Sequence, residues 1–102
     1  MNVNPINKNE QWKLLVLLLK ELAKEKGISQ QEIAESTGLI QSSISRFFSL
    51  KFKPNLDLFL EIAKAVKVNF FFEDQESKVD FNIVMENAME ALGRRPDKLP
   101  KN

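Results

Sequence analysis

Four polar side chains in the middle of the chain have the types and spacing needed to read the edges of base pairs. They are Gln41, Ser42, Ser45 and Arg46, within the string QSSISRFF. Residues three and four apart share one face of an α-helix, so a helix here would present all four on one side. Glutamine can pair with adenine and arginine with guanine, while a serine hydroxyl donates or accepts. Because this face carries no acid, we predict that it contacts DNA bases; the alternative is a solvated helix face.

A short helix is predicted directly before this face, within residues 28–48. Ser29 followed three residues later by Glu32 forms a capping box, in which hydroxyl and carboxylate each accept from a free backbone N–H group. The helix should therefore begin at about Gln30. Gly38 ends it, because the residue just past a helix end often needs a positive φ, which glycine adopts without strain.

A second helix must carry the polar face itself. It is predicted to begin at about Ile40 or Gln41 and to reach about residue 49. Ile44, Phe47 and Phe48 recur at helical spacing on the side opposite the polar residues. A helix of this kind fits the major groove of DNA, where the residues near its start meet base edges.

This pair of helices resembles the phage-repressor-like helix-turn-helix family, the Cro and repressor group also called XRE. The small Ala34, the glycine Gly38 and the apolar Ile44 are in register with the family motif, and the likeness extends over about residues 13–68, including PNLDLFLEIAKAVKV. The resemblance implies an all-α fold, a compact bundle of four to five helices of the lambda-repressor type. It also implies a DNA-binding function.

Three positions depart from the family pattern. Ile40 stands where the family usually has a serine or threonine cap, and Leu50 and Lys67 each stand where a glycine is common. All three lie at helix ends, so the departures concern those ends and leave the predicted fold unchanged.

The resemblance also assigns roles to individual residues. It places Gln41, Ser42 and Arg46 at the family's principal base-reading positions, with Ser45 nearby. Gln30 matches a glutamine that touches phosphate, helped by the positive end of its helix. The other candidates for phosphate contacts are Ser43, Lys51 and Lys53. For a lysine in a loop the usual alternative is simple solvation.

Composition excludes several other kinds of site. The 102 residues are 43% hydrophobic, enough for one core, and contain neither cysteine nor histidine. A disulfide framework, a zinc site or a hydrolase triad is therefore not expected, and we predict no enzyme, metal or cofactor. The apolar run LLVLLL is far shorter than the roughly 20 residues of a membrane span, and the start of the chain does not resemble a signal peptide, so a cytoplasmic protein is expected.

Charge is distributed unevenly although the formal net charge is only +1. Residues 38–55 hold three cations and no acid, residues 73–90 hold six acids and one lysine, and residues 94–101 hold four cations against Asp97. One part of the molecule can therefore face phosphates while another repels them.

The predicted domains follow from these patterns. Residues 1–9 are expected to be flexible, residues 10–75 to form the helix-turn-helix domain with its motif at about 29–48, and residues 76–102 to form an extension with a helix at about 80–92 and a polar tail. The tail is an ordered extension, a phosphate-contacting arm or a free end.

A helix predicted at about 10–26 carries a stripe of Trp12, Leu15, Val16, Leu19, Leu22 and Ala23. Leu14, Leu17 and Leu18 lie off that stripe, which predicts either a second covering layer or a helix central to the core.

Two segments could join two copies of the chain. At 68–73 the string VNFFFE favours a short edge β-strand slightly over a fifth helix, and an edge strand needs a partner. Near the C-terminus a further apolar stripe runs along the predicted helix at 80–92. The predicted interface residues are Phe70, Phe72, Phe81, Met85 and Leu92.

Together these features predict a sequence-specific transcriptional regulator that represses by occupying an operator. It is expected to bind double-stranded DNA as a homodimer, at an inverted-repeat site. One alternative is the antitoxin of a toxin–antitoxin pair, with the C-terminal segment holding the toxin. Another is a protein-interaction adaptor that has lost DNA binding, which an acid on the polar face would favour.

Overall fold

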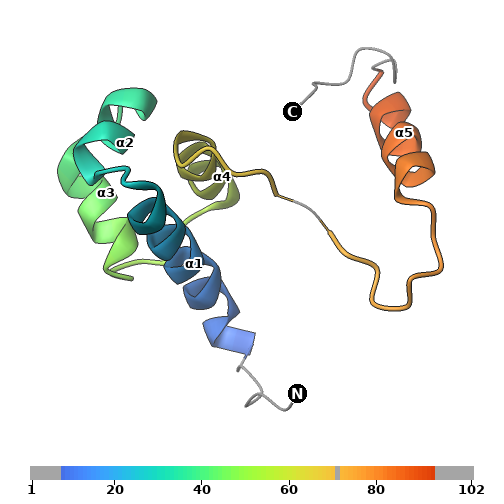
Figure 1. Ribbon diagram of the computed structural model, residues 1–102, viewed down its shortest axis with the longest axis horizontal. Helices are drawn as coiled ribbons and strands as arrows, with labels where there is room; N and C mark the ends of the chain where they lie inside the picture. Colours follow the sequence, from blue (N-terminus) through green and yellow to red (C-terminus); the bar gives the residue numbers. More distant parts are fainter. Residues whose placement is uncertain (1–7, 71, 94–102) are drawn as a thin grey trace. The chain divides into compact units, whose positions relative to one another are not determined.

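The chain folds into two units, described by a computed structural model over residues 8–70 and 72–93. The first unit, Met1–Phe70, contains a short 3-10 turn, Lys8–Glu10, and four helices (Figure 1). These are α1 (Gln11–Lys26), α2 (Gln30–Thr37), α3 (Gln41–Phe48) and α4 (Leu56–Ala65). The second unit, Phe71–Asn102, contains α5 (Phe81–Ala91). The described residues form no strand, so the predicted all-α fold is confirmed.

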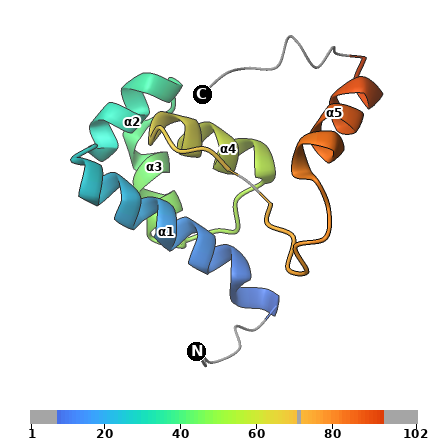
Figure 2. The same ribbon diagram turned by 45° about the vertical axis from the view of Figure 1, so that its right-hand side comes forward.

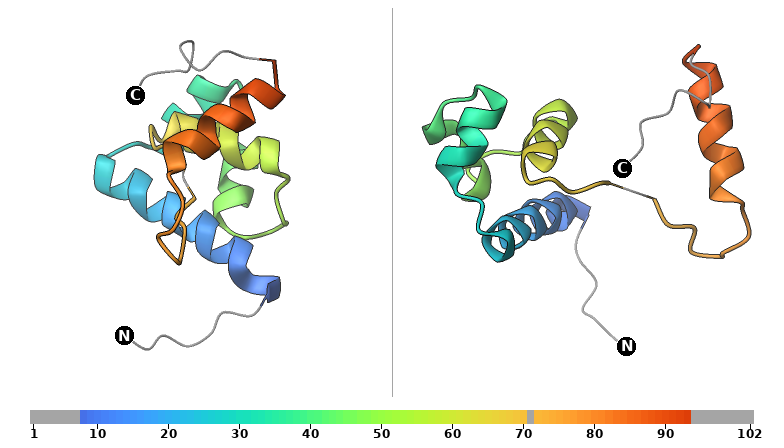
Figure 3. Two further views of the ribbon diagram at one scale, coloured as in Figure 1. Left: turned by 90° about the vertical axis from the view of Figure 1, so that its right-hand side faces the viewer. Right: turned by 45° about the horizontal axis from the view of Figure 1, so that its top comes forward.

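The core of the first unit is entirely apolar and draws on all four helices. Its α2 packs against both α3 and α4, while α1 packs against α3 and lies along one side of the group (Figures 2 and 3). Phe47 is central: its ring stands edge-on to that of Phe48 at 5.0 Å and lies 6.5 Å from that of Phe59. The buried residues are Val16, Leu19, Ala23, Ile33, Ala34, Ile44, Phe47, Phe48, Phe59, Ile62, Ala63 and Val66.

The ends of α2 are as the sequence predicts. Glu32 N–H donates to Ser29 Oγ at 3.1 Å, and Ser29 N–H donates to the Glu32 carboxylate at 3.0 Å, so both halves of the capping box are present. Gly38 follows the helix with φ of 75°. The helix therefore starts at Gln30, the predicted residue.

Two of the three departures from the family pattern impose a left-handed backbone on a bulky residue. Leu50 has φ of 61° and Lys67 has φ of 65°. An L-residue with a side chain is strained in this conformation by about 1–2 kcal/mol, whereas glycine is not. At the third departure, Ile40 precedes α3 without a side-chain hydrogen bond to the helix start. At Leu50 and Lys67 the backbone is thus left-handed although neither residue is glycine.

A side chain from α1 ties down the end of α4. Lys26 Nζ donates to the carbonyl oxygens of Val66 at 2.9 Å and Lys67 at 2.7 Å. These carbonyls lie at the end of α4, where backbone oxygens have no partner within the helix. The other end of α4 is capped by Asn55, whose side chain accepts from Leu58 N–H at 2.8 Å. Both ends of α4 are thus held by side chains.

The β-strand predicted at 68–73 is a wrong prediction. Its described residues are neither strand nor helix. A strand needs a hydrogen-bonding partner, and the described part of the chain offers none. The Phe70 ring instead packs edge-on against Phe59 at 5.4 Å, while Phe72 is 82% exposed. The segment is thus in contact with the core through the half-exposed ring of Phe70 and has no strand partner among the described residues.

Five leucines of α1 remain exposed, and we call them the leucine face. They are Leu14, Leu15, Leu17, Leu18 and Leu22, each 38–49% exposed. Leu15 and Leu22 belong to the predicted buried stripe, of which Val16, Leu19 and Ala23 alone are fully buried. A helix surrounded by the core is therefore excluded, and within the described part of the first unit no second layer covers these leucines.

Over residues 72–93, the second unit has no buried hydrophobic residue. Its loop is organised by Asp74, whose carboxylate accepts from the backbone N–H groups of Glu76, Lys78 and Val79 at 3.1, 2.7 and 3.2 Å. The start of α5 is capped by Asp80, whose carboxylate accepts from Asn82 N–H at 3.0 Å. None of the described helices is both long and apolar enough to cross a membrane.

Candidate nucleic-acid interface

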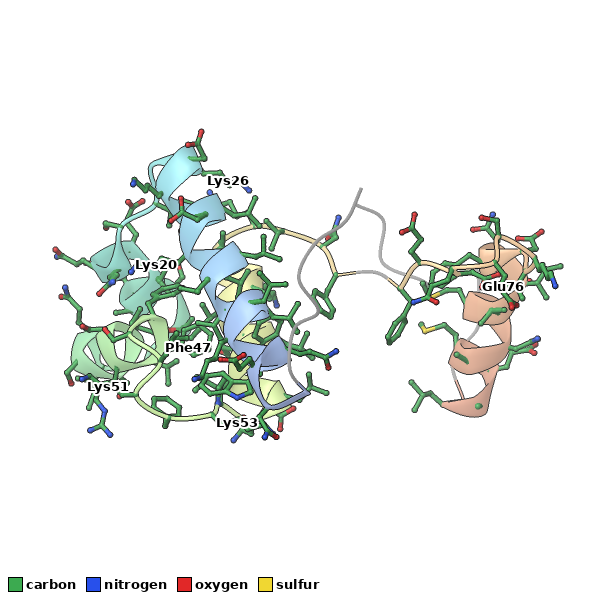
Figure 4. The ribbon with its side chains drawn as sticks, turned by 90° about the horizontal axis from the view of Figure 1, so that it is seen from below. Lys20, Lys26, Phe47, Lys51, Lys53 and Glu76 are labelled. Atoms are coloured by element: carbon green, nitrogen blue, oxygen red, sulfur yellow. The ribbon has the colours of Figure 1, made fainter. Side chains whose placement is uncertain are left out.

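The outward side of α3 is an uninterrupted polar surface. Gln41, Ser42, Ser45 and Arg46 are all exposed, and their helical spacing places them on one side of the helix. Opposite them, Ile44, Phe47 and Phe48 are buried in the core; the side-chain view shows Phe47 inside the unit (Figure 4). We call these four exposed residues the polar face of α3.

The turn between α2 and α3 holds this face in position. Thr37 Oγ1 donates to the carbonyl of Ile33 at 2.8 Å and accepts from Leu39 N–H at 3.2 Å. The hydroxyl therefore joins the last turn of α2 to the start of the connection. Because α3 is also anchored by three buried side chains, its orientation relative to α2 is determined by packing as well as by hydrogen bonds.

The predicted phosphate contacts lie around the polar face in different settings. Gln30 is the first residue of α2 and half-buried, and Ser43 is half-buried on α3. Lys51 and Lys53 are exposed in the loop between α3 and α4, where Figure 4 shows them separated along the loop. Ser43 thus has less room to reach a partner than the two lysines have.

Two lysines that sequence reasoning did not select lie beside Gln30. Lys20 and Lys24 of α1 line a hollow of about 280 Å³ together with Ser29 and Gln30, and Phe48 forms part of its wall. Both lysines thus lie near the start of α2, where backbone N–H groups and the helix dipole favour an anion. Their spacing of four residues predicts a shared helix face, but the sequence does not show that this face lies next to α2.

The stretch of chain that carries the polar face, residues 38–55, has positive charges and no acid. Gly38 to Asn55 contributes Arg46, Lys51 and Lys53 without any acid, and α1 adds Lys20 and Lys24 at the hollow. A polyanion such as DNA meets no like charge in this stretch. The arrangement combines hydrogen-bonding side chains on a helix with cations around them.

The predicted interface residues fall in both units. Phe70 belongs to the first unit and is half-exposed, with its ring against Phe59. Phe72, Phe81, Met85 and Leu92 belong to the second unit. Of these, Phe72 and Leu92 are the most exposed and Phe81 is half-buried.

Comparison with known families supports the same reading. A family model described as Helix-turn-helix matches residues 19–72, which is more than half of the chain. Comparisons with curated proteins and with solved structures gave no match. The matched residues include α2, the turn with Gly38 and the whole of α3. The chain therefore belongs to the Cro and phage-repressor type of helix-turn-helix family, also called XRE, whose members are DNA-binding regulators.

Proposed function

We propose that this protein represses transcription by binding an inverted-repeat operator as a homodimer. The observation that carries the proposal is the polar face of α3, which is exposed, free of acid and backed by buried Ile44, Phe47 and Phe48. In this role Gln41, Ser42, Ser45 and Arg46 read base edges in the major groove. Arginine and glutamine there select guanine and adenine through paired hydrogen bonds.

Phosphate contacts hold the protein in place along the groove. Lys51 and Lys53 are suited to this role because they are exposed and unhindered. Gln30 contributes with the N–H groups at the start of α2, and Lys20 and Lys24 add charge beside it. Ser43 is the remaining contact in this set. Such contacts raise affinity for any sequence and do not select among sequences.

Two copies are needed because one recognition helix reads too few base pairs for a specific site. A two-fold symmetric dimer places two recognition helices about 34 Å apart, one turn of DNA, and its site is an inverted repeat. The exposed apolar side chains of the second unit, among them Phe72 and Leu92, are the surface that we assign to dimer formation. Sedimentation of the intact chain, free and on DNA, tests this; a strict monomer in both states would refute it.

The antitoxin function is a second candidate, favoured by the same exposed surface on α5, which could hold a toxin. It shares the proposed DNA chemistry and differs in the partner of the second unit. A toxin-like reading frame next to the gene would support it. The adaptor alternative receives no support, because the polar face of α3 carries no acid.

The central experiment is binding-site selection from random DNA with the intact chain and with Arg46→Ala. Arg46 is exposed on the polar face, so its removal should leave the fold intact. We expect affinity for the selected site to fall by roughly 1–3 kcal/mol and preference at one base pair to relax. An unchanged selected sequence in the variant would rule out base reading by Arg46.

Lys51→Ala is the matched variant for a backbone contact. It removes one exposed cation from the loop after α3. Binding should weaken on every sequence alike, and the slope of log affinity against log salt should become shallower by about one unit. A loss confined to the preferred sequence would move Lys51 into the base-reading group.

A further inference from the structure

Ile40 is the most exposed large apolar side chain in the described part of the first unit. It is 72% exposed and directly precedes α3, the helix that carries the polar face. An apolar side chain that is exposed singly needs no explanation by itself. Ile40, however, stands at the start of the proposed recognition helix, where side chains meet base edges in the major groove.

The fold does not account for an isoleucine at this position. Ile40 is the N-cap residue of α3, with φ of −73° and ψ of 138°, and its side chain makes no hydrogen bond to the helix start. Serine, threonine, aspartate and asparagine stabilise a helix from the N-cap, whereas isoleucine is among the least favourable residues there. The chain has Ser29 and Asn55 at the same position of α2 and α4. At the start of α3 it therefore forgoes a stabilising cap.

Ile40 is also not required as the apolar contact at the start of α3. That role belongs to Leu39, which stands one residue before the N-cap and packs against the core. An apolar residue at this place commonly packs against the fourth residue of the helix, which is the fully buried Ile44 here. Leu39 thus faces the core, while Ile40 remains exposed to solvent.

The backbone holds Ile40 in a fixed place relative to α3. Its carbonyl oxygen accepts from the N–H groups of Ser43 at 2.9 Å and Ile44 at 3.3 Å, in the first turn of the helix. Isoleucine is branched at Cβ, so its χ1 angle is restricted as well. A stiff apolar side chain is thus held next to Gln41, the first residue of the polar face.

We propose that Ile40 contacts the 5-methyl group of a thymine in the major groove and makes the protein prefer thymine at that position. This rests on the proposed function and adds a base to those that the polar face reads. Of the four bases only thymine presents a methyl group there, and apolar side chains recognise it by contact. Adjacent Cα atoms are about 3.8 Å apart and base pairs about 3.4 Å apart, so the thymine should lie at or next to the base pair that Gln41 reads.

Replacing thymine with deoxyuridine tests the contact directly, because uracil lacks the 5-methyl group and pairs with adenine in the same way. Binding-site selection with the intact chain first defines the preferred site, and each thymine in it is then replaced singly. At one position in each half-site, affinity should fall about three- to fivefold, the loss expected when one methyl group is no longer buried. Selection with Gln41→Ala identifies the base pair that Gln41 reads, against which this position is compared.

Two variants assign the methyl contact to Ile40. In Ile40→Ala the ratio of the affinities for the thymine and deoxyuridine sites should fall to near one, whereas Ile40→Val, which keeps the branched Cβ, should retain most of it. The matched control is Leu56→Ala, because Leu56 is 68% exposed at the start of α4. This control should leave the ratio unchanged. An unchanged ratio in Ile40→Ala would overturn the proposal.

A third variant, Ile40→Ser, separates recognition from folding. Serine can cap α3, so the midpoint of urea unfolding should rise while the ratio of the two affinities falls to near one. A lower midpoint would show that Ile40 supports the fold, and would overturn its assignment as a residue present for recognition.

The outcomes are distinct from those of the proposed function. Sequence-specific binding with no loss at any deoxyuridine position would overturn the Ile40 contact and leave base reading by the polar face standing. Absence of sequence-specific binding would overturn both. The methyl group of 5-methylcytosine occupies the same place in the groove, so cytosine and 5-methylcytosine are also compared at each position. A gain from 5-methylcytosine without any loss from deoxyuridine would assign the contact to methylated cytosine and overturn the choice of thymine.

Discussion

Replacing Lys26 with methionine should loosen the contact between the ends of α1 and α4. The Lys26 amine donates to two carbonyl oxygens at 2.9 and 2.7 Å. A hydrogen bond to a charged group contributes about 1.5–3 kcal/mol when water is excluded, but this amine is exposed and water competes for it. We therefore expect the pair to contribute about 1–2 kcal/mol in total. Methionine retains the apolar stem, so the loss isolates the amine.

Urea unfolding measures this change. With a slope of about 1–2 kcal/mol per molar urea, as is typical of a small domain, the midpoint should fall by roughly 1 M with the slope unchanged. Lys24→Met is the control, because it removes the same charge from the last turn of the same helix. That variant corrects for the interaction of a cation with the helix dipole. Equal midpoints for the two variants would refute the assignment of Lys26 to the end of α4.

Two further predictions follow from the backbone. Lys67→Gly should stabilise the protein by about 0.5–1 kcal/mol, because it relieves the strain of lysine at φ of 65°. This relief is larger than the stability lost because glycine makes the unfolded chain more flexible. The control is Lys64→Gly, inside α4, which should destabilise the protein by a similar amount in the same unfolding assay. N–H groups of Lys78, Glu76 and Val79 hold the pKa of Asp74 below its ordinary value of 3.8, so loop stability is fully present above that pH and is lost as pH falls through the lowered pKa. Titration of the Asp74 carboxyl by NMR checks this, and a midpoint at or above 3.8 would contradict it.

The local features of the fold were predictable because their causes lie within a few residues. The capping box needs only Ser29 and Glu32, three positions apart, and Gly38 supplies a conformation that most residues avoid. The buried and exposed sides of α3 follow from helical periodicity alone. The candidate base readers could therefore be named from the sequence, because they share a short helix with its buried anchors.

Features that join distant parts of the chain could not be predicted in this way. Lys26 meets the end of α4 across 40 residues, and no local pattern marks that partner. The placement of Lys20 and Lys24 beside Gln30 depends on how α1 packs. The strand at 68–73 was wrong for a related reason. Phenylalanine and valine favour strands, but a strand also requires a partner. In the structure the Phe70 ring instead contacts the Phe59 ring, a contact that no local pattern predicts.

The hydrogen bonds of the Thr37 hydroxyl bear on the proposed contacts with DNA. The hydroxyl bonds to Ile33 in α2 and to Leu39 in the turn, two residues before α3 begins, and α2 also packs against α3. If Gln30 binds a phosphate at the start of α2, that contact also helps to determine where Gln41, at the start of α3, lies along the groove. In the proposed complex, Thr37 would thus influence the placement of the base-reading residues without touching a base itself.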